Sequence, residues 1–512
     1  MQQEPREETA QAAAHTSPAD RARPADPALP PDLALRADLL AAQQALLRTT
    51  AGPVILLLVG PETAGRGETA DLLNAWMDPR WLVTRAWGEP SDEERERPPF
   101  WRYWRALPQR GRVGIFLSGW YGPPILARAE GTLGAKAFDR RMAEISAFER
   151  ALVADGAVLV KCWLYVDSEV QRDRLERFEA DPLRRWRAGK AHWRRLRLHT
   201  KIVAAWNRAA AVTGDDLAPW HVVDADDPAH RHRRIATCVR DAIRRAVAAS
   251  TASRPPAGPV SPPQQHPAAH DRLASLDLDR SLKKERFRTE LERHQGRLYQ
   301  AQQEARERGI STVIVFEGWD AAGKGGAVRR VTAALDARYF RVIPIAAPTD
   351  EELAHHYLWR FWRHLSRAGG ITIFDRSWYG RVLVERVEGL ARADEWGRAY
   401  DEINELERQL VEHGTVVVKY FLHVSSDEQL RRFRERERTP YKRWKITDED
   451  WRNRKKREAY EDAINEMVER TSTRQAPWVL VEGNDKRFAR VKVVRTLADR
   501  LSRAVERSDK SA

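Results

Sequence analysis

The chain has 512 residues, too many for one ordinary hydrophobic core and enough for two to four domains of about 150 residues each. Apolar residues make up 42% and charged residues 32% of the sequence, so packed cores are expected and a wholly disordered chain is excluded. The 88 Lys and Arg against 74 Asp and Glu give a formal charge of +14, which should attract an anionic partner such as nucleic acid, acidic membrane, nucleotide or another polyphosphate.

The cysteines and the short apolar runs indicate the cellular setting. Cys162 and Cys238 are too few for a disulfide scaffold or a cysteine-based zinc site, and they favour a reducing compartment. The apolar run 54–59 is far shorter than the ~20 residues of a membrane helix. The N-terminal residues carry acids and lack the apolar segment of a secretion signal. We therefore expect a soluble cytoplasmic protein without a membrane partner.

Composition divides the chain into four segments. Residues 1–33 are rich in Ala, Pro, Glu and Arg and predict a disordered tail, and the Pro- and Ser-rich residues 250–270 predict a linker. The remaining residues, 34–249 and 271–507, form two predicted domains.

The two predicted domains match each other without a gap. Gly60 corresponds to Gly318, a shift of 258 residues (318 minus 60), and the same shift superposes six tryptophan pairs. These pairs are Trp101/Trp359, Trp104/Trp362, Trp120/Trp378, Trp186/Trp444, Trp193/Trp451 and Trp220/Trp478. So many rare residues in register indicate a tandem duplication of one fold.

The second domain shows the fold class most clearly, because strand-like apolar runs alternate with helical patterns. The predicted strands are 311–316, 341–346, 371–374, 415–424 and 478–481, and the predicted helices are 325–335, 351–367, 395–412 and 453–470. Alternation of this kind predicts an α/β fold, with a parallel sheet between two helical layers as in P-loop kinases.

A glycine-rich loop follows the first predicted strand of this domain. Residues 318–325 satisfy G-x-x-x-x-G-K and lie between a strand and a helix, where backbone amides can cradle a phosphate and Lys324 can reach it. The alternative is a glycine turn with a surface lysine. Gly325 stands where Ser or Thr normally binds Mg²⁺, so a metal would need other ligands.

Two carboxylates are placed to supply those ligands. Asp320 lies inside the loop, and Asp375 ends the predicted strand 371–374. Each could instead be a turn or capping residue, but the pair together favours a metal ion.

Polar residues after Asp375 suit a highly anionic substrate. Arg376 and Arg381 can bind phosphate oxygens through their planar guanidinium groups. Glu385 follows Arg381 at i,i+4, so a structural ion pair is the competing interpretation. We assign His355 and His356 to a helix face rather than to metal binding or phosphohistidine chemistry, since no carboxylate or cysteine lies at a suitable spacing.

Residues 425–460 are intensely charged and lie between a predicted core strand and a predicted core helix. A solvated helical hairpin is the plainer interpretation, but this position favours a lid that closes over substrate.

The first domain keeps the tryptophans and loses the polar set. Under the 258 shift, Lys324 becomes Arg66, Asp320 becomes Glu62, Asp375 becomes Leu117, Arg376 becomes Ser118, Arg381 becomes Pro123, Glu385 becomes Ala127 and Arg436 becomes Phe178. Leucine cannot hold a metal ion, and arginine does not replace a point-charge ammonium. We therefore expect a degenerate, inactive first domain.

The blocks G-W-D-A-A-G-K-G-G at 318–326, F-D-R-S-W-Y-G-R at 374–381 and R-F-R-E-R-x-x-x-P-x-K-R-W-K at 432–445 resemble the polyphosphate kinase 2 family. A degenerate copy before a complete one is similar to the two-domain branch of that family, which is associated with phosphoryl transfer to AMP. The resemblance implies inorganic polyphosphate as donor, AMP as acceptor, ADP as product, Mg²⁺ as cofactor and self-association.

The resemblance also implies roles for individual residues. Phosphate binding falls to Gly318, Gly323, Gly325, Gly326 and Lys324, and to the lid residues Arg436, Lys442 and Lys445. Metal binding falls to Asp320 and Asp375, and Arg376 and Arg381 orient phosphates.

Three alternatives stay open at this point. The acceptor could be ADP or GDP instead of AMP, or the enzyme could be an ATP-dependent kinase of a small metabolite. A nucleic-acid-binding protein would explain the charge but not the phosphate loop with its carboxylates, so no nucleic-acid partner is expected. AMP needs no catalytic base, since the second pKa of a phosphate is ~6, and phosphoryl transfer mainly needs alignment and charge neutralisation.

Overall fold

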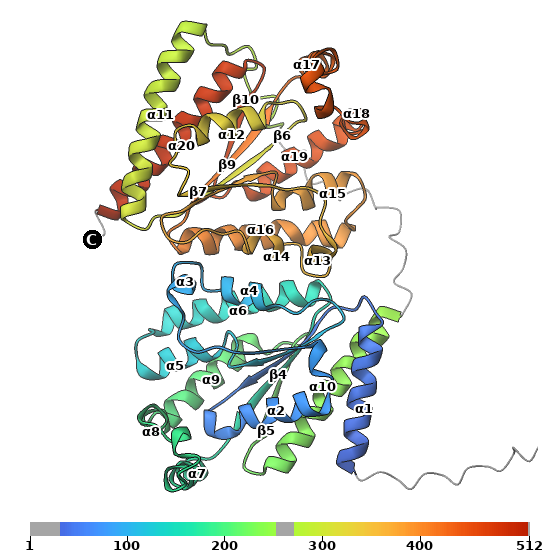
Figure 1. Ribbon diagram of the computed structural model, residues 1–512, viewed down its shortest axis with the longest axis vertical. Coiled ribbons are helices and arrows are strands. Elements are labelled where there is room, and N and C mark those ends of the chain that lie inside the picture. Colours follow the sequence, from blue (N-terminus) through green and yellow to red (C-terminus); the bar gives the residue numbers. More distant parts are fainter. Residues whose placement is uncertain (1–30, 252–270, 510–512) are drawn as a thin grey trace, which may run out of the picture.

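Each half of the protein folds around its own parallel five-stranded sheet, with helices on both faces (Figure 1). The computed structural model describes residues 31–251 and 271–509. The strand orders are β2-β3-β1-β4-β5 and β7-β8-β6-β9-β10, so the two sheets have the same topology. The predicted tandem α/β fold is confirmed. In the described ranges, no helix combines the length and the apolar character that crossing a membrane requires.

The first half contains strands β1 (Val54–Val59), β2 (Leu82–Ala86), β3 (Val113–Leu117), β4 (Val158–Tyr165) and β5 (Trp220–Asp224). Its helices are α1 (Pro31–Leu47), α2 (Arg66–Trp76), α3 (Asp92–Arg95), α4 (Trp101–Ala106), α5 (Gly122–Glu130), α6 (Ala135–Ala154), α7 (Ser168–Ala180), α8 (Lys190–Arg197), α9 (His199–Thr213) and α10 (Pro228–Thr251), with short 3₁₀ turns at Glu62–Ala64, Pro79–Trp81 and Arg185–Arg187.

The second half contains strands β6 (Thr312–Gly318), β7 (Phe340–Pro344), β8 (Ile371–Asp375), β9 (Val416–His423) and β10 (Trp478–Glu482). Its helices are α11 (Lys284–Glu307), α12 (Lys324–Thr332), α13 (Asp350–Leu353), α14 (Trp359–Trp362), α15 (Val384–Val387), α16 (Ala393–Glu412), α17 (Ser426–Arg438), α18 (Asp448–Lys455), α19 (Arg457–Thr471) and α20 (Lys486–Asp509), with 3₁₀ turns η4 (Trp378–Val382) and η5 (Pro440–Lys445).

The central strands explain why the sheets form. β1 is buried along its whole length, and β6 is buried up to its last residue. Continuous apolar runs of this kind suit a parallel sheet that helices cover on both faces. The parallel register sets Phe316 of β6 beside Asp375 of β8. Functional side chains therefore gather at the carboxyl edge of the sheet, where open α/β folds bind ligands.

Several predicted boundaries differ from the structure. The predicted tail and linker lie mostly outside the described residues, but α1 already begins at Pro31 and α10 extends to Thr251. The predicted helix 351–367 is wrong, because it is two short helices, α13 and α14, with irregular chain between them. The His356 ring explains the break, since its Nδ1 accepts a hydrogen bond from the Leu358 amide at 3.2 Å. A side chain that bonds nearby backbone competes with the helix.

The two halves meet through equivalent surfaces. Trp104 of α4 stacks on Trp362 of α14, with ring centroids 5.9 Å apart and planes 13° apart, and these residues are partners under the 258 shift. Arg367 forms an ion pair with Glu96 at 2.5 Å across the same junction. Figure 1 shows α3, α4 and α6 of one half facing α13, α14 and α16 of the other. The arrangement is that of an isologous two-fold interface within a single chain.

A buried lysine joins the elements of the second half. Lys419 of β9 lies 2.6 Å from the Glu407 carboxylate of α16 and donates to the Thr471 carbonyl at 2.7 Å. Glu407 also accepts hydrogen bonds from Tyr379 at 2.7 Å and Trp378 at 3.2 Å. Both charged side chains are almost fully buried.

The first half repeats this network. Lys161 lies 2.8 Å from Glu149 and donates to the Thr213 carbonyl at 2.6 Å, while Trp120 and Tyr121 donate to Glu149 at 2.8 Å each. The five positions correspond under the 258 shift. The network therefore belongs to the architecture that both halves share.

Removing one partner of this pair should destabilise the protein. Lys419→Ala should lower the free energy of unfolding by about 3 to 5 kcal/mol, because it leaves the Glu407 carboxylate buried without a counter-charge. Lys161→Ala should have a similar effect in the first half. Urea denaturation followed by circular dichroism measures both. The double variant Lys419→Met/Glu407→Leu should lose less than Lys419→Ala, and an equal or larger loss would contradict this explanation.

Candidate functional site

The phosphate loop begins at the end of β6 and needs glycine at two positions. Gly318 has φ +144°, and a Cβ there would lie 2.4 Å from the Leu422 carbonyl oxygen. Gly323 has φ +111° and opens α12 from the left-handed region. Lys324 folds back over the loop and donates to the carbonyl oxygens of Gly318 at 2.5 Å and Trp319 at 3.3 Å. The loop therefore has the strand, turn and helix geometry of a phosphate cradle.

Asp320 is held from two sides. One carboxylate oxygen accepts a hydrogen bond from the Asn453 side chain at 3.0 Å, and the other lies 3.4 Å from the Arg376 guanidinium. Asn453 belongs to α18, so the charged segment reaches directly into the loop. The sequence did not indicate Asn453, because only the fold brings it to Asp320.

Four of the predicted residues line one cavity of about 80 Å³: Gly318, Asp320, Lys324 and Arg376. Glu317, Asn453 and Tyr460 line it as well. Asp375 ends β8 beside β6 and is half-buried. The cavity joins a phosphate loop, a carboxylate and a guanidinium, which are the groups that phosphoryl transfer uses.

Arg376 follows β8 with a positive φ of 65°, and its counterpart Ser118 has φ 67°. The backbone therefore makes the same turn in both halves, and only the side chain differs. Burial alone would lower the pKa of Arg376, but the charges of Asp320 and Glu317 outweigh burial and raise it. Arg376 is thus a fixed positive charge in the cavity.

Glu317 is a functional candidate that the sequence analysis missed. It is the penultimate residue of β6, it is buried, and it accepts a hydrogen bond from the Ser377 hydroxyl at 2.8 Å. Burial is the main cause that raises the pKa of Glu317 to about 7, although Ser377 and Lys324 favour the charged form. The sequence signal that could have identified Glu317 is an acidic residue at the carboxyl end of an otherwise apolar strand.

Arg432 is a second missed residue, and it fixes the shape of the loop. Its side chain is 2% exposed and donates to the carbonyl oxygens of Ala321 and Ala322 at 2.9 Å each. It also donates to Gly483 and Asn484. Its counterpart Arg174 bonds three of the four equivalent carbonyls of the first half, those of Thr63, Ala225 and Asp226, at 2.8 Å each.

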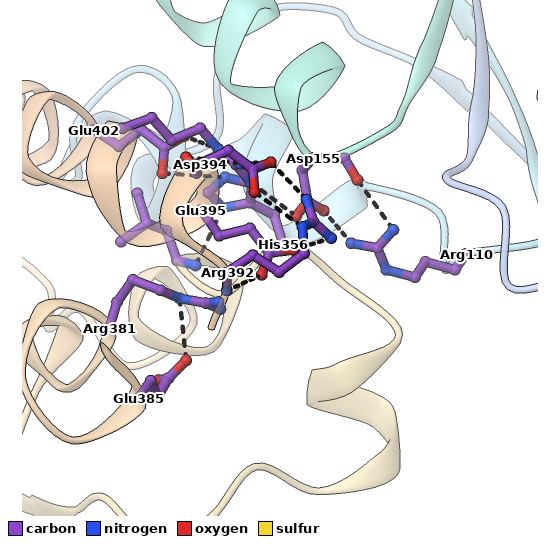
Figure 2. Close-up of polar contacts among 11 residues, drawn as sticks. Arg110, Asp155, His356, Arg381, Glu385, Arg392, Asp394, Glu395 and Glu402 are labelled. Carbon is purple, nitrogen blue, oxygen red and sulfur yellow. Dashed lines mark hydrogen bonds and ion pairs between the residues drawn. The ribbon is translucent and has the colours of Figure 1, made fainter. Parts of the chain in front are cut away.

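Arg381 and Glu385 form the ion pair that the sequence analysis gave as the competing interpretation. Their side chains are 3.1 Å apart, and the Arg381 guanidinium also lies 4.5 Å from the centroid of the Tyr357 ring. Figure 2 shows this pair at one edge of a polar cluster. Neither residue lines the 80 Å³ cavity, so the phosphate-orienting role of Arg381 stays a prediction.

The assignment of His355 and His356 to a helix face is wrong. Both lie between α13 and α14, and His356 is buried with its Nε2 3.6 Å from the Glu402 carboxylate. Arg398 bonds Glu402 at 3.0 Å and lies 3.6 Å from Asp155 of the first half. The histidine thus takes part in the junction between the halves.

The charged segment is helical, as expected, and consists of α17, η5 and α18. Arg436 is half-buried on α17. The side chains of Lys442 and Lys445 lie outside what the structure describes. Tyr441 and Trp444 are 76% and 75% exposed. The segment covers the loop through Asn453 and Arg432, which is the position that a lid requires.

The residues present fit a divalent cation. Within residues 31–251 and 271–509, no three His, Cys, Asp or Glu side chains gather closely enough to hold a metal by themselves. Mg²⁺ is usually bound by one or two carboxylates and completes its shell with water and substrate phosphates. Asp320, in the loop after β6, and Asp375, the last residue of the adjoining strand β8, match that donor set.

His423 supports the loop from β9. Its Nδ1 accepts a hydrogen bond from the Trp319 indole at 2.9 Å. Burial is the main cause that lowers the pKa of His423 to about 4, and the nearby Arg457 lowers it further. The neutral ring is therefore the form that the folded protein holds.

Comparison with known proteins gives one consistent result. Residues 32–251 and 281–509 each match the family model described as Polyphosphate kinase 2. A polyphosphate:AMP phosphotransferase of Pseudomonas aeruginosa is 46% identical over 471 residues, which cover 92% of this chain and 94% of the relative. Another from Acinetobacter johnsonii is 35% identical over 476 residues and covers 90% and 94%. A polyphosphate kinase 2 crystal structure from Pseudomonas aeruginosa has a TM-score of 0.83 at 45% identity, covering 93% of this chain and 95% of that one.

Acid should destabilise the protein through His423. The folded pKa is about 4 and the unfolded value is about 6.5, so the stabilisation is complete above pH ~6.5 and is lost as the pH falls toward 4. Between pH 7.5 and pH 5 the wild type should lose about 2 kcal/mol of unfolding free energy that His423→Gln does not lose. Urea titrations at both pH values measure the difference, and equal pH slopes in the two proteins would contradict it.

Proposed function

The chain belongs to the polyphosphate kinase 2 family, and on that basis we propose that it transfers the terminal phosphoryl group of inorganic polyphosphate to AMP, giving ADP. Relatives at 46% and 35% identity, aligned over nine-tenths of the chain, carry the name polyphosphate:AMP phosphotransferase. The observation that carries the proposal is the single cavity that joins the phosphate loop, Asp320 and Arg376.

The phosphate loop holds the phosphoryl group in transit. Amides of Gly318, Gly323, Gly325 and Gly326 and the positive end of α12 surround a phosphate. Lys324 exchanges its bonds to the loop carbonyls for the transferred phosphoryl group. Arg432 keeps the loop in this shape through the Ala321 and Ala322 carbonyls, so little reorganisation is needed when the substrate binds.

Asp320 and Asp375 bind a divalent cation, which we take to be Mg²⁺. The cation would neutralise phosphate charge as the transfer proceeds. Asn453 and Arg376 orient Asp320 before the metal arrives. A side chain that is oriented in advance keeps its lone pairs available to the metal.

The acceptor needs no general base. The phosphate of AMP is largely ionised at pH 7, because its second pKa is ~6. Arg376 and Arg381 neutralise and align the phosphates, and the lid residues Arg436, Lys442 and Lys445 close over the polymer. Polyphosphate carries a charge on each phosphate, so the basic lid binds it as proteins bind a nucleic-acid backbone.

The first half, residues 34–249, does not turn over substrate. Leu117 stands where Asp375 binds metal, and Arg66 donates a hydrogen bond to Ser118 at the position of the catalytic lysine. We further propose a cytoplasmic location, which the two free cysteines favour, and self-association of the chain.

The donor and the acceptor can be tested in one assay. Purified protein with Mg²⁺, AMP and long-chain polyphosphate should form ADP, and ATP as donor should support at most a few per cent of that rate. Parallel reactions with ADP or GDP as acceptor test the open alternatives. A faster rate with ATP, or a faster rate with ADP than with AMP at equal concentration, would contradict the proposal.

Matched substitutions test which half acts. Asp375→Asn should lower kcat by at least about a hundredfold, since charge stabilisation of this size is typical of phosphoryl-transfer ligands. The control is Leu117→Ala, at the corresponding position of the first half, which should keep kcat within about twofold. Initial rates at saturating AMP and polyphosphate measure both. A comparable loss in Leu117→Ala would show that the first half takes part in turnover.

A further inference from the structure

The first half keeps a cavity at the position of the catalytic one, and it is larger. Its volume is about 230 Å³, compared with about 80 Å³ in the second half. Gly60, Arg66 and Trp163 line it where Gly318, Lys324 and Phe421 line the other. The cavity therefore descends from a substrate site, and its shape is held by the same loop and the same clamping arginine, Arg174.

The chemistry of its walls has changed in a consistent direction. Val59 replaces Glu317, Ser118 replaces Arg376 and Ile202 replaces Tyr460. These changes remove an acid, a guanidinium and a phenol from the cavity wall, and an aliphatic side chain stands at two of the three positions. Leu117 also stands in place of Asp375, so the first half lacks one of the two carboxylates to which metal binding is assigned.

Basic side chains also line the cavity. Arg66 lies at the start of α2, and Arg195 of α8 stands where the second half has the neutral Asn453. His192 and His199 line the cavity as well, and Glu89 is the one carboxylate among the described lining residues. Two guanidinium groups beside a helix N-terminus suit a phosphate.

Two tryptophans also line the cavity. Trp87 is half-buried, and Trp163 stacks on Trp206 with ring centroids 4.7 Å apart. Apolar and aromatic walls of this kind can pack against a flat ring such as a nucleobase.

We propose that this cavity binds a nucleoside monophosphate without a metal ion, with the phosphate at Arg66 and Arg195 and the base against Trp87 and Trp163. Ligand pockets of this type combine apolar walls with a few placed polar groups. The site lies in the half that lacks the metal carboxylate, so it is a binding site and not a second catalytic centre.

Calorimetric titration of AMP into the full chain in EDTA tests this site. The background is Val384→Trp, which fills the catalytic cavity, and it should retain one AMP site per chain. Adding Leu126→Trp, the corresponding substitution in the first half, should abolish the remaining binding. Retention of that site in the double variant, or absence of any site in Val384→Trp, would overturn the proposal.

A milder pair of variants covers the case in which a new tryptophan disturbs folding. In the Val384→Trp background, Arg195→Ala should weaken AMP binding at least tenfold. Arg197→Ala, an exposed arginine on the same helix α8, should change it less than twofold. Equal effects of the two substitutions would overturn the proposal, as would tighter binding of octanoate or phenyl phosphate than of AMP. ADP formation by the wild type is measured separately, so failure of this site and failure of the proposed function are distinguishable.

Discussion

The buried lysine–glutamate pair is the interaction on which the rest of each half depends. Lys419 links β9, which lies beside the central strand β6, to α16 and α19, and Glu407 anchors Trp378 and Tyr379, which follow Arg376 after one intervening residue, Ser377. A buried pair of this kind adds little net stability but tolerates few alternative arrangements. It fixes the chain beyond β8, and with it the direction in which Arg376 leaves the strand. The first half keeps the network although Leu117 and Ser118 stand where the second half has Asp375 and Arg376, so the role of the network is architectural.

Duplication separates what the fold needs from what the chemistry needs. Both halves keep the buried pair, the arginine that clamps the loop, and the positive φ after the third strand of each half. They differ in the side chains that face the cavity, where Val59 and Ser118 stand in place of Glu317 and Arg376. Backbone shape is maintained by interactions outside the cavity, so these side chains could change without loss of the cavity.

Sequence reasoning predicted what depends on local order and on the 258 shift. The phosphate loop, the strand before it and the i,i+4 pair of Arg381 and Glu385 are local features, and their geometry follows from spacing. Asn453 reaches Asp320 across 133 residues, and the Arg432 clamp depends on where α17 packs, so neither could be read from spacing. The predicted helix 351–367 failed because the His356 ring accepts a hydrogen bond from the Leu358 amide, two residues along the chain, and also faces Glu402 of α16. Hydrophobic periodicity reports neither contact.

Apolar side chains of both halves meet at the junction between them. Trp362 is 1% exposed, and Trp104 of the first half stacks on it. Helix α16 has two faces: Arg398 and Glu402 lie toward the junction, and Glu407 lies toward the core. Helix α16 thus lies between the first half and the buried network of Lys419 and Glu407. Without the first half, the apolar face of α14 would be exposed to water, and an exposed apolar face of this kind requires a partner. The first half supplies this partner within the same chain, through a surface equivalent to that of the second half.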